Sequence, residues 1–88
     1  MTTQNNQTAE FKIDHQVDAK GLKCPMPVIK LQQQVRSTRP GKTIEIICTD
    51  PGAEKDIASW CKVNKHQLLT TNQHEDNFSI IIEVKGRS

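Results

Sequence analysis

The sequence contains no tyrosine, and its aromatic residues are limited to two phenylalanines and one tryptophan. A hydrophobic core must therefore be aliphatic, built from nine isoleucines, five valines and four leucines. No apolar run exceeds three residues, whereas a membrane-spanning helix needs about 20. The N-terminus also lacks the basic start and the apolar stretch of a secretory signal peptide. These absences predict a small cytoplasmic protein without a membrane span.

The charges are nearly balanced, with 12 basic and 10 acidic residues spread along the 88-residue chain. A protein that binds nucleic acid through its phosphates usually carries a clustered basic face, so direct nucleic-acid binding is not expected. The three cysteines, Cys24, Cys48 and Cys61, form neither a Cys-x-x-Cys pair nor the close-set ligands of a zinc site. We therefore expect reduced thiols, no metal and no cofactor.

Composition divides the chain into a polar tail and one domain. Thr, Gln and Asn dominate residues 1–10, which are predicted to be a disordered polar tail. Residues 11–86 are predicted to form a single domain. Alternating or β-branched residues predict strands over 11–17, 43–49, 66–71 and 78–85. Helical spacing predicts one helix between Pro25 and Pro40 and a second that begins near Ala53.

The predicted order of elements is β-α-β-α-β-β. Two helices that connect strands, followed by a final hairpin, are typical of an α/β two-layer sandwich. Right-handed crossovers would place both helices on one face of a four-stranded mixed sheet.

Cys24 is the candidate reactive residue. Proline is tolerated only in the first turn of a helix, so Pro25 and Pro27 place a helix start directly after this cysteine. The first-turn amides of a helix carry partial positive charge, which predicts a lowered pKa for a thiol there. Lys23 adds to the positive field, and the sequence places no obvious base or metal beside the sulfur.

The other polar candidates have ordinary structural interpretations. Cys48 and Cys61 are in phase with apolar neighbours and are predicted to lie in the core. Asp18 and Asp50 follow strands, where turn or cap contacts are favoured, although either could orient the loop that carries Cys24. No catalytic role is expected for the histidines His15, His66 and His74, because spacing alone identifies no partner for them.

Residues 18–27, with the sequence DAKGLKCPMP, resemble the signature Asp-x-x-Gly-x-x-Cys-Pro-x-Pro of the TusA/SirA-like sulfur-carrier family. The likeness continues through the Pro-Gly pair at 40–41, the Asp-Pro turn at 50–51 and Cys61, and covers about residues 11–86. It implies a two-layer sandwich similar to the C-terminal domain of translation initiation factor three. It also implies that Cys24 accepts a sulfane sulfur as a persulfide. The implied donor is a pyridoxal-phosphate cysteine desulfurase or a rhodanese, and the implied recipient is an acceptor protein.

The resemblance also assigns roles to the residues around the sulfur. Cys24 would be the catalytic residue of a sulfurtransferase-type persulfide carrier. The residues implied to shape the loop and the helix start are Asp18, Gly21, Pro25 and Pro27. The candidate partner contacts are Lys23, Met26 and Asp50. In TusA proper the sulfur ends in 2-thiouridine of tRNA, but TusA tends to carry Glu where this chain has Met26.

Two alternatives stay open at the level of sequence. A non-catalytic module that binds RNA or a protein regulator would not need the thiol at all. A peroxide-sensing thiol would form a disulfide from Cys24 to Cys48 or Cys61.

Overall fold

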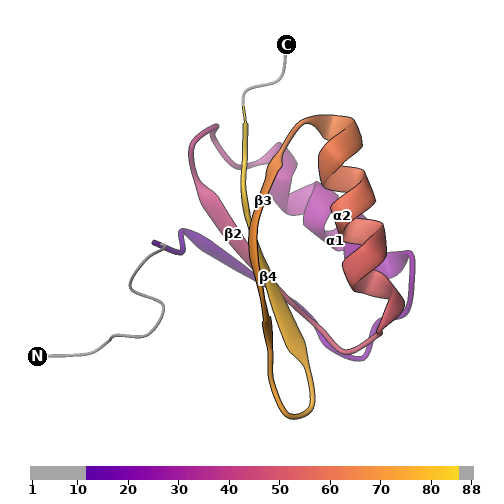
Figure 1. The fold of residues 1–88 in the computed structure, drawn as a ribbon. Coiled ribbons are helices and arrows are strands. Elements are labelled where there is room, and N and C mark those ends of the chain that lie inside the picture. Colours follow the sequence, from indigo (N-terminus) through magenta and orange to yellow (C-terminus); the bar gives the residue numbers. More distant parts are fainter. Residues whose placement is uncertain (1–11, 86–88) are drawn as a thin grey trace, which may run out of the picture.

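A computed structural model of the chain, described for residues 12–85, contains six elements in one sheet and one helix layer. They are β1 (His15–Ala19), α1 (Met26–Arg36), β2 (Thr43–Cys48), α2 (Gly52–Asn64), β3 (Gln67–Gln73) and β4 (Phe78–Glu83). The sheet order is β1-β2-β4-β3, with β1 parallel to β2 and β4 antiparallel to both neighbours. Both helices cover the same face of the sheet (Figure 1). The predicted two-layer α/β sandwich is confirmed.

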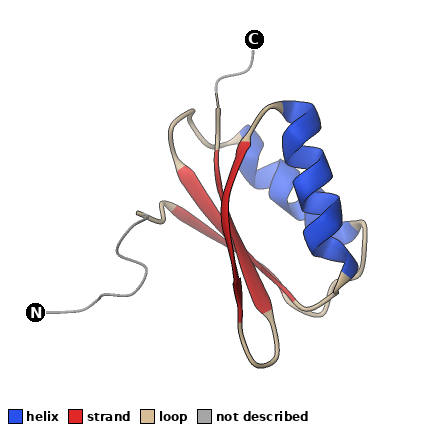
Figure 2. Ribbon diagram, viewed as in Figure 1, coloured by secondary structure: helices blue, strands red, loops and turns tan. Residues whose placement is uncertain are grey.

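The parallel pairing of β1 with β2 decides where the functional loops lie. Its register runs from His15 opposite Ile44 to Ala19 opposite Cys48, so both strands end at the same edge of the sheet. Each strand is followed by a loop and then by a helix. Figure 2 shows that the two loops, in tan, meet at that edge beneath the helices. The starts of α1 and α2 are therefore neighbours, although residues 26 and 52 are far apart in sequence.

The core is aliphatic, as the composition requires, and it lies between the sheet and the helices. In β2, Ile44, Ile46 and Cys48 are fully buried and alternate with half-buried residues. Leu31 contributes from α1, and Cys61 from α2 is only 2% exposed. Both cysteines predicted to lie in the core do so. Burial raises the pKa of Cys48 to about 11 and that of Cys61 to about 11, so both thiols stay protonated at neutral pH.

Two strands extend further than the sequence pattern predicts, because hydrogen bonding to a neighbouring strand keeps polar residues at their ends extended. The predicted break after residue 17 is wrong, because pairing with β2 keeps β1 extended through Ala19. The predicted loop over 72–77 is shorter, because Gln73 still pairs with Phe78 of β4. The predicted tail over residues 1–10 and the start of the first predicted strand lie outside the described residues.

Both faces of β4 are buried. Ser79 and Ile81, which point away from the core, are each only 1% exposed. β4 is flanked by β2 and β3 along its length. Ile81 lies between Glu45 of β2 and Thr70 of β3.

Neither helix within residues 12–85 has the length and apolar character needed to cross a lipid bilayer.

Replacing either core cysteine with serine should destabilise the fold, because each puts a hydroxyl into a site built for sulfur. We expect Cys48→Ser and Cys61→Ser to lower the free energy of unfolding by about 1–3 kcal/mol, measured by urea titration. Val63→Ser, at a position that is 78% exposed, is the control and should change it by less than about 0.5 kcal/mol. Equal effects at the three positions would contradict the assignment of Cys48 and Cys61 to the core.

Candidate functional site

Cys24 lies at the start of α1, where two prolines fix the backbone. Pro25 is the N-cap residue of α1 and Pro27 occupies one of its first two positions, so neither proline removes a helical hydrogen bond. The Cys24–Pro25 peptide bond is cis. The Met26 N–H donates to the Lys23 carbonyl oxygen at 2.8 Å, which closes a turn around the cysteine. The thiol is half-buried and packs against the edge of the core.

Two hydrogen bonds join the loop that carries Cys24 to the loop between β2 and α2. The Gly21 N–H donates to Thr49 Oγ1 at 2.8 Å, and the Cys24 N–H donates to Asp50 Oδ2 at 2.9 Å. Gly21 has a φ of 81°, in the left-handed region that residues with a Cβ resist. Asp50 therefore orients the backbone of the reactive residue from a loop 26 positions away.

The sulfur of Cys24 also lies against the first turn of α2. A Cβ atom built on Gly52 would lie 3.3 Å from Cys24 Sγ and 3.8 Å from Asp50 Oδ2. Gly52 is the first residue of α2 and has no left-handed φ, so a Cβ there would crowd the sulfur without straining the backbone. The thiol therefore lies near the first residues of both helices. Cys24 precedes α1 in the sequence, and its sulfur lies close to Gly52 at the start of α2. Nothing in the local sequence identified Gly52 as part of the site.

Two carboxylates determine the protonation of this thiol. A hydrogen bond with the Asp56 carboxylate is the largest cause and one with Asp50 the second, and together with desolvation they raise the pKa of Cys24 to about 12. In return, hydrogen bonds from the backbone and side chain of Cys24 lower the pKa of Asp50. The predicted lowering of the Cys24 pKa is therefore wrong. The sequence places Cys24 after Lys23 and before a helix, but the fold places it against two acids.

Asp56 is the residue that sequence reasoning missed. It lies four positions after Gly52, so both residues occupy the same face of α2. That spacing is visible in the sequence, but its meaning depends on α2 packing beside the Cys24 loop. A Gly-x-x-x-Asp spacing at a helix start gives no sign by itself that a thiol lies opposite.

Three further predicted site residues, Asp18, Lys23 and Met26, are not among the groups that shift the pKa of the thiol. Asp18 lies in β1, where it pairs with Ile47, and its Oδ1 accepts the Lys20 N–H at 3.0 Å, so its side chain supports the turn that follows the strand. The charge of Lys23 lowers the pKa of Asp50. Met26 is 47% exposed and follows the cis-proline directly, so it lies on the surface beside the sulfur. Within residues 12–85 no group of three or more His, Cys, Asp or Glu side chains is arranged to hold a metal ion.

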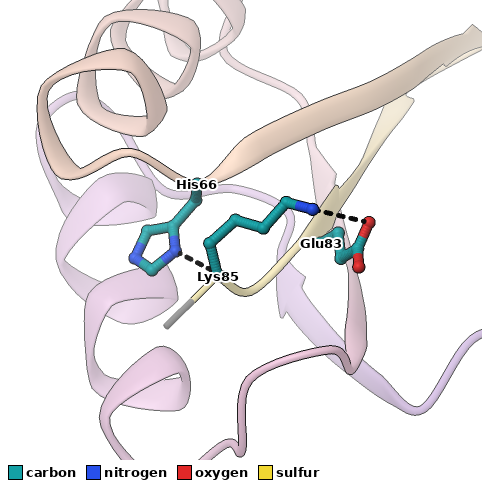
Figure 3. A network of polar contacts seen from close by, with 3 residues as sticks. All are labelled: His66, Glu83 and Lys85. Carbon is teal, nitrogen blue, oxygen red and sulfur yellow. Dashed lines mark hydrogen bonds and ion pairs between the residues drawn. The ribbon is translucent and has the colours of Figure 1, made fainter. Parts of the chain in front are cut away.

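His66 makes a hydrogen bond and a ring contact at the end of the sheet opposite to Cys24. His66 Nδ1 accepts the Lys85 N–H at 3.1 Å, and Lys85 Nζ pairs with Glu83 at 3.5 Å (Figure 3). The His66 ring stacks on Trp60 with 5.2 Å between centroids. A cavity of about 530 Å³ opens at this edge, lined in part by His66, Trp60 and Lys85, but Cys24 does not line it. His66 therefore has a structural role away from the thiol.

Gly52→Ala tests the contact between α2 and the sulfur. The new methyl group would lie 3.3 Å from Cys24 Sγ, so the sulfur must shift by a few tenths of an ångström, and we expect this shift to weaken the effect of Asp56 and Asp50 on the thiol. We expect iodoacetamide to alkylate Cys24 several-fold faster at about pH 8, because the pKa of a thiol falls when carboxylates are withdrawn. The free energy of unfolding should not fall, because alanine favours helical backbone over glycine by about 0.5–1 kcal/mol.

Ser59→Ala is the control for that experiment, because Ser59 is an exposed residue of the same helix. It should leave the alkylation rate of Cys24 unchanged. Equal alkylation rates in the Gly52→Ala and Ser59→Ala variants would show that the sulfur does not depend on the missing Cβ.

Comparison with known proteins places this geometry in a family. The chain is similar in fold to the SirA-like protein of Desulfitobacterium hafniense, whose crystal structure superposes with a TM-score of 0.72 at 15% sequence identity. The match covers 82% of this chain and 99% of that one, and at this identity it shows the fold alone. The profile of the family described as "Sulfurtransferase TusA" matches residues 15–84, which include Cys24, Asp50, Gly52 and Asp56. The chain therefore belongs to the TusA sulfurtransferase family.

Proposed function

We propose that this protein is a sulfur carrier that accepts sulfane sulfur as a persulfide on Cys24 and passes it to an acceptor protein. The observation that carries the proposal is the placement of Cys24 on a loop fixed by proline and by the Asp50 hydrogen bond, with its sulfur half-buried rather than enclosed. Membership of the TusA family supports a carrier role for this chain. Cys48 and Cys61 are buried, so Cys24 is the one cysteine that a partner reaches without unfolding the domain.

The proposed transfer exchanges one sulfur–sulfur bond for another. The sulfur of Cys24 attacks the outer sulfur of a donor persulfide, R–S–SH, and the S–S bond of the donor breaks. The donor leaves as R–S⁻ and takes up the proton that Cys24 loses. The products are a donor thiol and a Cys24 persulfide, so no external oxidant or reductant is consumed. An acceptor thiolate then removes the outer sulfur by the same exchange.

We propose a cysteine desulfurase or a rhodanese as the donor and a sulfur-relay protein as the acceptor. The route would end in tRNA 2-thiouridine or in another sulfur-trafficking pathway. Exposed residues beside the sulfur, Lys23 and Met26, support docking of a protein there. All three cysteines are free thiols, which fits the reducing environment of the cytoplasm.

Sulfur loading tests this function directly. After incubation with a cysteine desulfurase, its pyridoxal cofactor and cysteine, we expect a mass increase of about 32 Da on the peptide that contains Cys24. Cys24→Ser should abolish the added mass, whereas Cys61→Ala should keep it, since that substitution buries no new polar group. Undiminished loading of the Cys24→Ser variant would overturn the proposal.

A further inference from the structure

We propose that the cavity at the end of the domain opposite to Cys24 binds a small molecule that carries a planar ring and a phosphate, such as a nucleoside monophosphate. In this site the ring lies against Trp60 and the phosphate binds to Arg36, both of which line the cavity. The thiol is not part of the site, so the inference goes beyond the proposed carrier function and does not depend on it.

The cavity lies between the last turns of the two helices and the end of β4. It is lined by Val35 and Arg36 from α1, by Trp60 from α2 and by Val84 after β4. Its volume of about 530 Å³ falls within the range of small-molecule sites, about 300–1,000 Å³. Arg36 is the last residue of α1, and at about 1.5 Å per residue it lies about 15 Å along the helix from the start beside Cys24. The cavity and the thiol are therefore separate places on the domain.

The aromatic wall of the cavity is held in position by His66. The rings of Trp60 and His66 stack with 5.2 Å between their centroids and 29° between their planes. His66 Nδ1 accepts the Lys85 N–H at 3.1 Å, which fixes the imidazole from the end of β4 (Figure 3). Trp60 is half-buried and lines the cavity, so part of the indole is accessible there. A planar ring that packs on this indole meets a side chain that is already ordered, which reduces the entropic cost of binding.

Arg36 supplies positive charge that no acidic side chain offsets. It is exposed and lines the cavity from the end of α1. Among residues 12–85 the one ion pair joins Lys85 to Glu83, so Arg36 takes part in none. Within that described range no Asp or Glu lines the cavity. A guanidinium binds phosphate oxygens through two parallel N–H donors, and this makes an oxyanion the matching ligand group.

Lys85 brings a second positive charge to the rim of the cavity. Its Nζ lies 3.5 Å from Glu83 Oε1, and Figure 3 shows the ammonium turned toward Glu83 and away from the His66 ring. The side chains of this pair are 43% and 30% exposed, and exposed ion pairs are weak. The flexible lysine therefore exchanges its carboxylate partner for a bound phosphate at little cost. A phosphate monoester carries nearly two negative charges at neutral pH, which suits a site with Arg36 and Lys85 better than a single carboxylate does.

Helix ends carry partial negative charge, which opposes the binding of an anion. Donors beside the cavity reduce this effect. The side-chain amide of Asn64 donates to the Trp60 carbonyl oxygen at 2.9 Å in the last turn of α2. At the end of α1, Thr38 Oγ1 donates to the Gln34 carbonyl oxygen at 2.6 Å. With these carbonyl oxygens occupied, the charges of the arginine and the lysine decide the sign of the field in the cavity.

Trp60 fluorescence tests the site directly, because Trp60 is the one tryptophan of the chain and the sequence has no tyrosine. We expect AMP to quench this fluorescence in a saturable manner, since its base stacks on the indole. Adenosine, which lacks the phosphate, and ribose 5-phosphate, which lacks the base, should each bind about 10-fold more weakly. Absence of saturable quenching by AMP up to about 10 mM, a concentration at which millimolar binding is visible, would overturn the proposal. Adenosine that binds as tightly as AMP would overturn it too.

A pair of variants tests the phosphate contact. Arg36→Gln should weaken AMP binding about 10-fold, because hydrogen bonds between charged groups are about twice as strong as neutral ones. Lys55→Gln removes the same charge from an exposed position of α2 that does not line the cavity, so it should bind AMP like wild type. Equal AMP affinities in the two variants would show that the nucleotide binds elsewhere and would refute the site.

A third variant tests whether the site is separate from the thiol. Cys24→Ser should bind AMP as tightly as wild type, because Cys24 does not line the cavity. Loss of AMP binding in this variant would contradict a separate site. Failure of the carrier function is distinct, since it is measured by sulfur uptake on Cys24 and not by Trp60 fluorescence.

Discussion

The parallel pairing of β1 with β2 is the constraint on which the rest of this site depends. Because parallel strands end at the same edge of a sheet, the loop after Ala19 and the loop after Cys48 are brought together with both helix starts. The Gly21–Thr49 and Cys24–Asp50 hydrogen bonds then join the two loops. The Cys24 thiol is positioned in this way while it stays half-buried rather than enclosed, which suits the proposed carrier function.

The electrostatics of the site come from two opposed influences. A helix start favours an anionic sulfur through its free amides, whereas hydrogen bonds from the thiol to Asp56 and Asp50 favour the neutral form. The carboxylates have the larger influence, since the pKa of Cys24 is raised to about 12. A carrier gains from this arrangement, since an anionic thiol is readily oxidised before a donor arrives.

Much of the fold could be predicted from periodicity and from proline. β-branched composition located β2, alternation located β4, and the two prolines located the start of α1. Burial of Cys48 followed from its phase with Ile44 and Ile46. Strand ends were less predictable, because pairing with a neighbour keeps polar residues such as Gln73 extended.

The sequence by itself determined that Cys24 stands on a proline-fixed corner at a helix start, and that the other two cysteines belong to the core. Only the tertiary structure decided which residues surround the Cys24 thiol and in which direction its pKa shifts. Gly52 and Asp56 come from a helix that begins 28 positions after Cys24, and their effect on the sulfur exists only once α2 lies beside the loop. The direction of the pKa shift depends on those long-range neighbours. For this reason the local sequence predicted a lowered pKa for the thiol, and the folded protein raises it.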